Sequence, residues 1–469
     1  MLFVSLTFLF LFLPMVLGLY YILKGHRNLQ NIVLFLASLF FYAWGEPKFV
    51  VVLLISIICN WLLAALIDRS TSEPIRKTYL SVAVLINIGL LFVYKYLNFF
   101  VAQINHLGSL DIQIREIALP IGISFFTFQA LSYVIDVFRG EKCQSNPFYV
   151  GLYISFFPQL IAGPIIRYNT IEDQILNRKE SFDDFKYGTL RFVQGFSKKV
   201  LLANTMAVIA DKAFSLTGGD LTVSFAWLGA IAYTLQIFFD FSGYSDMAIG
   251  LGKMFGFHFD ENFNYPYISS SVTEFWRRWH ISLSTWFRDY VYIPLGGNRT
   301  GSSARNYLNL FVVWLLTGIW HGANWTFIAW GLLYFVFLII EKATQFGRFI
   351  NDHKVIGHIY TLFVVIMLWV IFRADGIHQA ATYIGTMLGI AGADIYSGMT
   401  WVYIKENLVY FIFAVALSTD LFARIRNKRE VRISVFADIA GEVCLAAVFA
   451  VSIVYIINGT YNPFIYFHF

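Results

Sequence analysis

Continuous apolar segments, many of them long enough to cross a bilayer, recur along almost all of the 469 residues. A run of about 18 or more apolar residues with few charges predicts a transmembrane helix. Hydrophobic residues make up 58% of the chain and charged residues only 13%, whereas soluble domains carry about 25% charged residues. The sequence therefore predicts an all-α, polytopic membrane protein, with about eleven spans and additional re-entrant and interfacial helices.

One apolar segment, residues 148–166, contains Pro158 and Pro164. Proline removes a backbone hydrogen bond and clashes with the preceding helical turn, so a straight helix cannot continue through both residues. Irregular backbone is tolerated at membrane depth only where it is buried in protein or lines a wet cavity. The segment is therefore predicted to be broken or re-entrant.

A polar stripe interrupts the longest apolar span, residues 225–254, where Gln236, Asp240 and Tyr244 follow one another at intervals of four. This spacing places the three side chains on one helical face. A carboxylate at the centre of a membrane costs at least about 2.5 kcal/mol, so the stripe is predicted to face the protein interior. Two interpretations remain open here: the stripe binds substrate along a channel, or it joins helices by hydrogen bonds.

Residues 256–305 lack a clear span and are basic, which favours a cytoplasmic location. Residues 274–290 carry aromatic side chains at helical spacing and are predicted to form one amphipathic helix. Such a helix suits a membrane interface and can serve as a plain anchor. Alternatively, the segment forms a cytoplasmic mouth that receives an anionic acyl donor, and Arg277, Arg278 and Arg288 meet its phosphates or a partner that carries them. Trp279 is then a further substrate contact.

Residues 306–330 form two apolar arms around a turn that contains Trp320, His321, Gly322 and Asn324. The first arm, residues 307–320, would be only about 20 Å long at ~1.5 Å per residue, which predicts a turn below the membrane surface. An ionisable residue held at that depth is by default a candidate for function. The competing interpretation is a histidine that only bonds a backbone carbonyl and packs two helices together.

Several function classes have no support in the sequence. No basic patch resembles a nucleic-acid surface, and no metal-ligand cluster or Gly-rich phosphate loop is visible. The three cysteines, Cys59, Cys143 and Cys444, show neither metal nor disulfide spacing. We therefore expect no metal site and no bound cofactor.

Four stretches together resemble the membrane-bound O-acyltransferase family. They are residues 156–164 (FFPQLIAGP), 240–246 (DFSGYSD), 275–298 with WHISL at 279–283, and 320–322 (WHG). Residues 462–467 also resemble the bacterial subgroup that O-acetylates alginate and related exopolysaccharides. The resemblance covers nearly the whole chain and implies a single membrane domain, residues 1–469, built around a central tunnel.

The resemblance also implies the chemistry. The family's catalytic histidine falls on His321, in the tunnel, and a second family histidine falls on His280, toward the cytoplasm. An imidazole that titrates near pH 6.5 can take a proton from a hydroxyl group near neutral pH. His321 is therefore expected to act as general base or to carry the acyl group transiently, and His280 to orient the donor or assist as an acid. Trp320 and Asn324 are expected to contact the substrate.

What the resemblance implies about substrates and partners is equally specific. Acetyl-CoA is the expected cytoplasmic acyl donor, and an extracytoplasmic polysaccharide is the expected acceptor, reached directly or through a periplasmic or extracellular acetyltransferase. The expected location is the bacterial cytoplasmic (inner) membrane.

Two alternatives stay open. Within the family, the chain could transfer D-alanine from a carrier protein to teichoic acid. In another class, it could transport a polymer or a small solute. Transporters often show paired interrupted helices in matching halves, and this sequence shows no such repeat.

Overall fold

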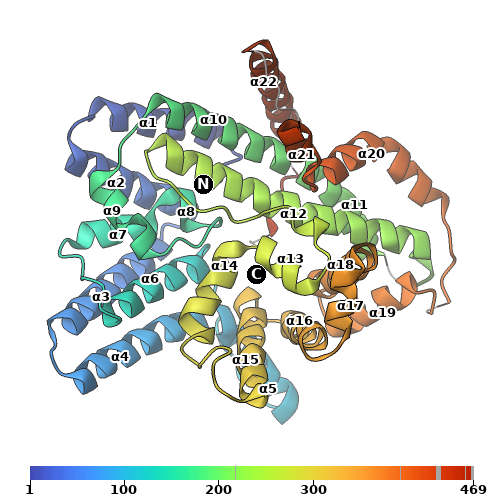
Figure 1. Ribbon diagram of the computed structural model, residues 1–469, viewed down its shortest axis with the longest axis horizontal. Coiled ribbons are helices and arrows are strands. Elements are labelled where there is room, and N and C mark those ends of the chain that lie inside the picture. Colours follow the sequence, from blue (N-terminus) through green and yellow to red (C-terminus); the bar gives the residue numbers. More distant parts are fainter. Residues whose placement is uncertain (217, 391, 429–434, 460, 466–469) are drawn as a thin grey trace. The chain divides into compact units, whose positions relative to one another are not determined.

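The structure of the protein, a computed structural model, describes residues 1–216, 218–390, 392–428, 435–459 and 461–465. Every secondary-structure element among them is helical (Figure 1), which confirms the all-α prediction. Residues 466 and 467 of the predicted C-terminal motif lie outside the described residues. Two compact units make up the chain: Met1–Phe192 with Ser245–Asp260, and Val193–Tyr244 with Glu261–Phe469. The prediction of a single domain is not tested by this division and stays a prediction.

Within the described residues, eight helical segments are long and apolar enough to cross a membrane. These candidate spans are Arg27–Gly45, Phe49–Arg69, Glu73–Gly108, Val223–Met254, Trp325–Ala343, Lys354–Arg373, Gly398–Leu417 and Asp438–Asn458. Two shorter apolar helices cover Phe8–Ile22 and Ile123–Phe138. The chain is thus a polytopic helical membrane protein, and its described residues contain fewer full-length spans than the roughly eleven that hydropathy suggested.

The first unit is built from helices of the N-terminal part of the chain. They are η1 (Phe8–Phe12), α1 (Leu13–Ile22), α2 (Arg27–Gly45), α3 (Phe49–Arg69), α4 (Glu73–Leu91), η2 (Phe92–Tyr96), α5 (Leu97–Gly108), α6 (Ile123–Phe138), α7 (Pro147–Ser155), α8 (Phe157–Leu160) and α9 (Tyr168–Asn177). Two further helices, α10 (Phe182–Ser197) and α12 (Val223–Met254), continue from one unit into the other.

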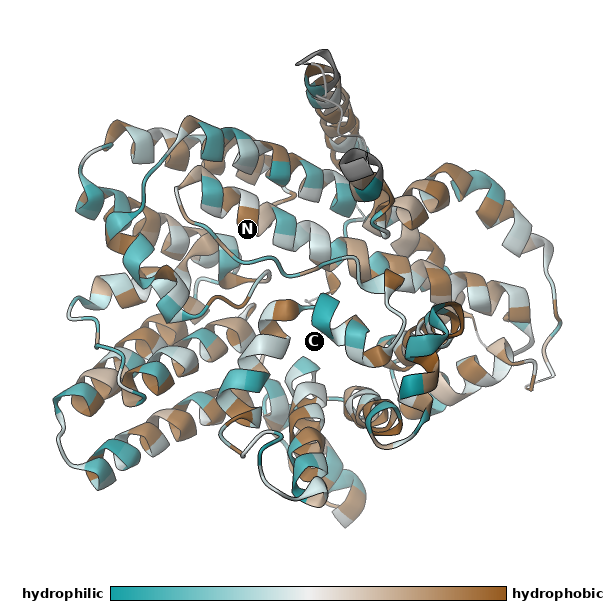
Figure 2. Ribbon diagram, viewed as in Figure 1, coloured by the Kyte–Doolittle hydropathy of each residue, from teal (hydrophilic) through white to brown (hydrophobic). Residues whose placement is uncertain are grey.

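The packing of the first unit centres on α6, which α3 and α4 contact and whose residues are almost all buried. Asn60 of α3 and Asn87 of α4 exchange side-chain amide hydrogen bonds of 3.3 and 2.7 Å. Such pairing satisfies polar groups that would be expensive to leave unbonded in an apolar surrounding. Apolar residues otherwise dominate α3 and α4, and hydrophilic residues gather at the first turns of α4 (Figure 2).

The segment that contains Pro158 and Pro164 is broken, as predicted. The helix α7 ends at Ser155, the four-residue helix α8 follows, and residues 161–167 are not helical. Phe157 anchors this break, because its ring contacts the rings of Phe8, Phe12 and Phe41. The irregular backbone is therefore buried in protein, as membrane depth requires.

The second unit contains the remaining helices. They are η3 (Lys198–Ala203), α11 (Asn204–Ser215), η4 (Gly218–Asp220), η5 (Pro266–Ile268), α13 (Val272–Arg278), α14 (Ile281–Phe287), η6 (Arg288–Tyr292), α15 (Ser303–His321), α16 (Trp325–Ala343), α17 (Phe346–Asp352), α18 (Lys354–Arg373), α19 (Ile377–Met387), α20 (Gly398–Leu417), α21 (Leu421–Lys428) and α22 (Val435–Asn458). Its core forms where α13, α16 and α18 contact one another, with α15 packed along α16.

The helices α15 and α16 form a tight hairpin because glycines let their backbones meet. A Cβ atom on Gly318 would lie 2.6 Å from the carbonyl oxygen of Phe327, and one on Gly331 would lie 2.5 Å from that of Trp314. Both distances are shorter than real Cβ contacts, so a side chain at either position would force the helices apart.

Both arms of this hairpin are longer than predicted. Each has 19 residues, about 28 Å at ~1.5 Å per residue. The first arm begins earlier because the Ser302 side chain accepts a hydrogen bond from the Arg305 backbone N–H and starts the helix among polar residues. The argument that short arms force the His321 turn below the membrane surface is therefore wrong, and the surroundings of His321 must be judged from its contacts.

Candidate active site

His321 is the last residue of α15. Its imidazole lies among three aromatic rings, with centroid distances of 5.0 Å to Trp320, 4.9 Å to Trp330 of α16 and 5.1 Å to Phe372 of α18. The residue is 7% exposed. Three helices thus enclose one ionisable ring in an aromatic cage.

Gly322, which follows His321, has no room for a side chain. A Cβ atom there would lie 2.4 Å from the ring of Phe327, and that ring in turn contacts Phe372 with a centroid distance of 4.8 Å. The Trp-His-Gly sequence therefore has a steric reason: glycine lets the chain leave α15 directly against the cage.

His280 lies between α13 and α14 in a left-handed backbone conformation, with φ 45° and ψ 55°. A non-glycine residue in this region costs about 1–3 kcal/mol. Backbone hydrogen bonds hold the conformation, from Ile281 N–H to the Asn262 carbonyl (3.0 Å) and from Asn264 N–H to the Arg278 carbonyl (2.9 Å). Strain that is held in this way, at a histidine, is a signal of function.

The single amphipathic helix predicted for residues 274–290 is therefore wrong. The chain breaks at Trp279 and His280 into two seven-residue helices. Its aromatic residues do not lie at an interface: Trp276, Trp279 and Trp286 are buried. Trp276 packs against Trp314 and Tyr334, and Trp279 against Trp369. These rings therefore pack in the core of the second unit and not at a lipid interface. That Trp279 contacts the donor stays a prediction.

The two histidines meet at one indole. Trp320 lies 6.0 Å from the ring of His280 and 5.0 Å from that of His321, measured between centroids. His280 is 1% exposed and also contacts the ring of Phe241 at 4.6 Å. The structure thus brings together His280, Trp320 and His321, which the sequence singled out separately.

Some buried polar atoms around these rings have no hydrogen-bond partner among the described residues. They are Nε2 of His280, Nε1 of Trp276, Nε1 of Trp330 and the hydroxyl group of Tyr334. An unsatisfied buried donor or acceptor costs about 1–3 kcal/mol, so such a cluster calls for an explanation. One explanation is that these atoms form hydrogen bonds with polar groups of a substrate.

Burial also sets the charge of His280, which lies outside the candidate spans. It lowers the pKa of this imidazole from 6.5 to about 3. His280 is therefore neutral at physiological pH and offers a lone pair rather than a positive charge.

Glu341, at the end of α16, holds the N-terminus of α13. Its carboxylate accepts hydrogen bonds from the backbone N–H groups of Val272 (2.6 Å) and Thr273 (2.9 Å) and from the Thr273 hydroxyl (2.6 Å). An anion at a helix N-terminus satisfies free N–H groups and complements the helix dipole. Glu341 thus fixes the helix that leads into His280.

The polar stripe on α12 is buried but does not act as one unit. Asp240 forms an ion pair with Lys199 at 2.7 Å, with both side chains 2% exposed, and accepts a 2.8 Å hydrogen bond from the Ile465 backbone N–H. Tyr244 packs on Phe464. These contacts support the interpretation that Asp240 and Tyr244 join structural elements. Gln236 is also buried, and its Oε1 atom has no hydrogen-bond partner among the described residues.

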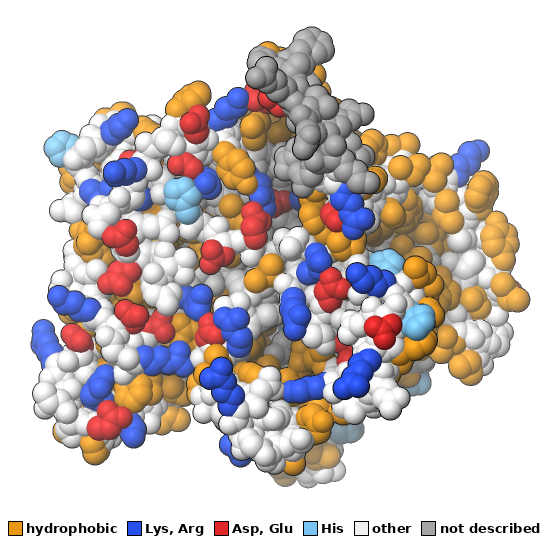
Figure 3. Space-filling model, in the orientation of Figure 1, with side chains coloured by type: hydrophobic (Ala, Val, Ile, Leu, Met, Phe, Trp, Pro, Cys, Tyr) orange, Lys and Arg blue, Asp and Glu red, His pale blue; other side chains and the backbone are white. Residues whose placement is uncertain are grey.

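The predicted donor-binding arginines differ in their surroundings. Arg277 is exposed, whereas Arg278 forms an ion pair with Glu274 at 2.9 Å. Within the second unit, charged side chains gather over α13 and α17, while hydrophobic side chains dominate over α19 and α20 (Figure 3). Asn324 caps α16, accepting from Thr326 N–H at 3.1 Å and donating to the Asp375 carbonyl at 2.9 Å. That these residues bind substrate stays a prediction.

Asn262, Glu341 and Trp330 were not predicted from the sequence as parts of the site. A glutamate at the end of a span looks like an ordinary loop charge, and a tryptophan inside an apolar run looks like lipid-facing bulk. Asn262 gave no local signal, because its role depends on residues about 20 positions later. Within the described parts of the chain, no three His, Cys, Asp or Glu side chains gather as a metal site would require.

The model of the membrane-bound O-acyltransferase (MBOAT) family matches residues 36–378, which include both histidines and all four motif stretches. The chain belongs to this family. The membrane-bound O-acyltransferases are enzymes that transfer acyl groups, so this chain is an acyltransferase of the membrane.

Curated relatives extend the match over the whole chain. The probable alginate O-acetylase AlgI of Pseudomonas putida is 40% identical over 100% of both chains. Its counterpart in Pseudomonas syringae pv. tomato is 46% identical over 82% of this chain and 75% of that protein. The peptidoglycan O-acetyltransferase of Helicobacter pylori is 34% identical over 83% of this chain and 80% of that protein.

Proposed function

We propose that this acyltransferase transfers acetyl groups from cytoplasmic acetyl-CoA for the O-acetylation of an extracytoplasmic polysaccharide. The observation that carries the proposal is the pair of buried imidazoles, His280 and His321, that share the indole of Trp320. The names of the relatives matched over most of the chain support the acyl group and the acceptor class, because they are named for the O-acetylation of alginate and of peptidoglycan.

The proposed reaction uses His321 as general base. A hydroxyl oxygen attacks the thioester carbonyl carbon, His321 takes the hydroxyl proton, the carbon–sulfur bond breaks, and the proton passes to the departing thiolate. Proton transfer by a positioned imidazole contributes about 10²–10⁴-fold to a rate. In a second route, the acetyl group rests on His321 before it reaches the hydroxyl. In both routes the chain needs no bound cofactor, and acetyl-CoA is a substrate.

The location and partners follow from this reaction. We place the enzyme in the bacterial cytoplasmic (inner) membrane, where its candidate spans contact the lipid bilayer. The donor comes from the cytoplasm and the polysaccharide lies on the other side. A periplasmic or extracellular acetyltransferase completes the transfer to the sugar where the acceptor is indirect.

The two alternatives have weaker support. D-alanyl transfer to teichoic acid shares the family and the histidines, but the relatives that match over most of this chain are named for O-acetylation. Transport of a polymer or solute would not explain why two histidines meet at one aromatic ring. Neither alternative predicts that labelled acetyl groups leave acetyl-CoA.

Membrane vesicles that contain the enzyme test the proposal with acetyl-CoA labelled in the acetyl group and an added alginate or peptidoglycan fragment. We expect labelled ester in the wild type and its loss in His321→Ala at equal protein level. His358→Ala is the matched control, because it removes another imidazole of the second unit, one on α18 whose Nδ1 lies 3.1 Å from the Ser269 carbonyl oxygen. Equal transfer by wild type and His321→Ala would overturn the catalytic role, and transfer from a D-alanyl carrier instead would overturn the donor.

A further inference from the structure

We propose that Asn262 is a positioning residue that holds His280 in the tautomer with the proton on Nδ1, so that Nε2 accepts a hydrogen bond from an O–H or N–H group of the substrate. The tautomer follows from geometry alone, whereas contact with substrate rests on the proposed function. Asn262 is fully buried, on the segment that precedes η5.

The first step fixes the orientation of the Asn262 amide. The Ser282 backbone N–H lies 3.2 Å from Oδ1 of Asn262, and the Ser282 hydroxyl donates to the same atom at 2.9 Å. A backbone N–H can only donate, so the Asn262 atom that faces it must be the oxygen. This removes the usual ambiguity between the two ends of an asparagine amide.

The second step fixes the proton on His280. Its Nδ1 lies 3.1 Å from the same Oδ1 of Asn262. Since that oxygen can only accept, Nδ1 must carry the hydrogen, and in a neutral imidazole Nε2 then holds a lone pair. Asn262 therefore decides which nitrogen of His280 is the acceptor.

The third step concerns charge. The contacts of His280 are Asn262, Ser282, Phe241 and Trp320, none of which is charged. On neighbouring elements, Asp240 of α12 pairs with Lys199, Glu274 of α13 pairs with Arg278, and Arg277 and Glu261 are exposed. On α15, the other titratable ring next to Trp320 is His321. Burial alone lowers the pKa of His280, to about 3, so the acceptor stays unprotonated at neutral pH.

These steps assign His280 a different role from the acid that the resemblance allowed. A neutral imidazole with its proton on Nδ1 cannot donate from Nε2. The Nε2 atom has no hydrogen-bond partner among the described residues, and a substrate hydroxyl or amide group would supply the missing donor. His280 thus orients a substrate group as an acceptor, which leaves the proton transfer to His321.

Solid-state NMR of the enzyme with ¹⁵N-labelled histidine in lipid tests the tautomer without reference to activity. Among nine histidines, His280 is the one whose signals vanish in His280→Gln. We expect its Nδ1 to be protonated and its Nε2 not, and we expect Asn262→Leu to lose this preference. A proton on Nε2 in the wild type would overturn the proposal, whatever reaction the enzyme performs.

Activity provides the second readout. In serine proteases, where the imidazole itself moves the proton, loss of the group that fixes its tautomer lowers kcat about 10⁴-fold. His280 only accepts a hydrogen bond, so we expect Asn262→Leu to lower kcat less, by about 10²-fold. The control is Asn309→Leu, which also removes a buried amide, one that donates to the Gly297 carbonyl at 3.1 Å. An equal loss in both variants would reduce Asn262 to a folding role and contradict the proposal.

The Asn262→Asp variant separates positioning from folding by its pH profile. A carboxylate keeps the acceptor for Nδ1–H but also stabilises the imidazolium, so the pKa of His280 should rise. Since the protonated ring has no lone pair, the acidic limb of the kcat profile should move to higher pH, with activity retained at pH 8. An unchanged limb would count against the proposal. If His321→Ala keeps full activity while the NMR result holds, the proposed function fails and the tautomer assignment stands.

Discussion

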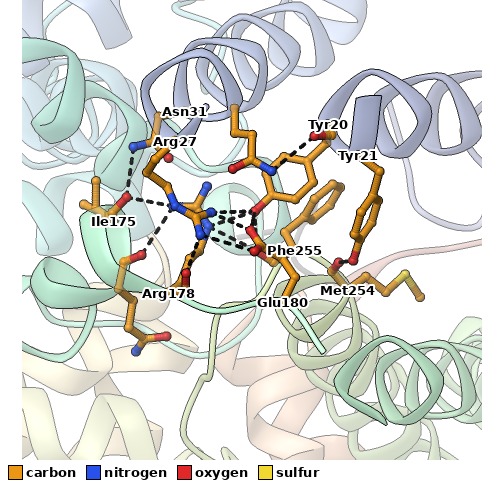
Figure 4. A network of polar contacts seen from close by, with 11 residues as sticks. Tyr20, Tyr21, Arg27, Asn31, Ile175, Arg178, Glu180, Met254 and Phe255 are labelled. Carbon is orange, nitrogen blue, oxygen red and sulfur yellow. Dashed lines mark hydrogen bonds and ion pairs between the residues drawn. The ribbon is translucent and has the colours of Figure 1, made fainter. Parts of the chain in front are cut away.

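Polar side chains are buried both in the network around Arg27 in the first unit and in the aromatic cage around the histidines in the second unit. The two regions differ in how many hydrogen-bond and ion-pair partners these side chains have. In the network, Arg27 Nη1 lies 2.5 Å from Glu180, whose carboxylate also binds the Tyr20 hydroxyl. Arg178 donates to Tyr20 (3.0 Å) and to the Phe255 carbonyl (3.1 Å), as Figure 4 shows. One nitrogen of Arg178, Nη2, is left without a hydrogen bond among the described residues.

The cage around the histidines is built from rings instead of partners. His280 has one satisfied nitrogen and one unsatisfied nitrogen, and nearby Trp330 and Tyr334 each bury a donor without a hydrogen bond among the described residues. A network whose members are nearly all satisfied makes the fold more rigid. A site whose unsatisfied atoms cluster around titratable rings is instead poised for a ligand. The difference predicts that substitutions in the network change stability and substitutions in the cage change activity.

The largest expected effect is on activity, in the cage. His321→Ala should lower acetyl transfer by about 10²–10⁴-fold, because it removes the proposed general base. Its thermal unfolding temperature in detergent should stay close to that of the wild type, since Trp330 and Phe372, which the removed ring contacts, also pack against each other at a centroid distance of 5.1 Å. Measuring transfer rate and unfolding on the same preparation checks this. If the variant unfolded at a much lower temperature but its acetyl-transfer rate per folded molecule were unchanged, the role of His321 would be structural and not catalytic.

The next effect is on stability, in the network. Glu180→Gln should lower the free energy of unfolding by about 2–3 kcal/mol, because it leaves Arg27 without its ion pair and weakens the acceptor of the Tyr20 hydroxyl. The rate per folded molecule should not change. The matched control is Glu73→Gln, whose carboxylate is 56% exposed and pairs with Lys77 at 3.4 Å. Exposed pairs contribute about 0–1 kcal/mol, so a similar loss in both variants would remove the special role of the network.

The same carboxylate gives a pH dependence. Burial raises the pKa of Glu180, but hydrogen bonds from Arg27 and Tyr20 outweigh it and leave the pKa below its usual value. The unfolded chain then binds more protons than the folded one as pH falls through about 4.3, the usual glutamate pKa. The stabilisation by Glu180 is therefore present at neutral pH and lost in acid. Unfolding temperatures of wild type and Glu180→Gln should converge as pH falls from 7 to 4.

The intermediate case is Glu341, which is structural by its contacts but serves the cage. Glu341→Gln keeps one oxygen for the N-terminus of α13 and removes the charge, which should cost about 1 kcal/mol of stability. Because α13 leads into His280, acetyl transfer should also fall several-fold. A stability loss with full activity would show that the position of α13 does not matter to the cage.

Hydropathy predicted most of the fold because burial in lipid selects for apolar runs, and Pro158 predicted a break because proline cannot continue a helix. The site was harder. Helical spacing in residues 274–290 could not reveal that His280 adopts a left-handed conformation, since bonds to Asn262 and Arg278 impose it. Composition placed Trp276 and Trp279 at an interface, although a core of rings attracts the same residues. Motifs and polarity predicted His280, Trp320 and His321 as site residues. That both histidines contact the indole of Trp320 became visible only in the structure.

The smallest expected effect separates Arg277 from Arg278, two of the predicted donor-binding arginines. Arg277 is exposed and Arg278 is held by Glu274, so of these two residues Arg277 is the one whose guanidinium is available to the phosphates of the proposed donor, acetyl-CoA. Arg277→Ala should raise KM for acetyl-CoA about three- to tenfold with kcat unchanged, since loss of uniform binding affects KM alone. The increase should shrink at high salt, because exposed charges are screened. Arg278→Ala is the comparison, and it should lower stability slightly because Glu274 loses its ion-pair partner. A larger increase in KM for Arg278→Ala than for Arg277→Ala would place the donor site at Arg278 and not at Arg277.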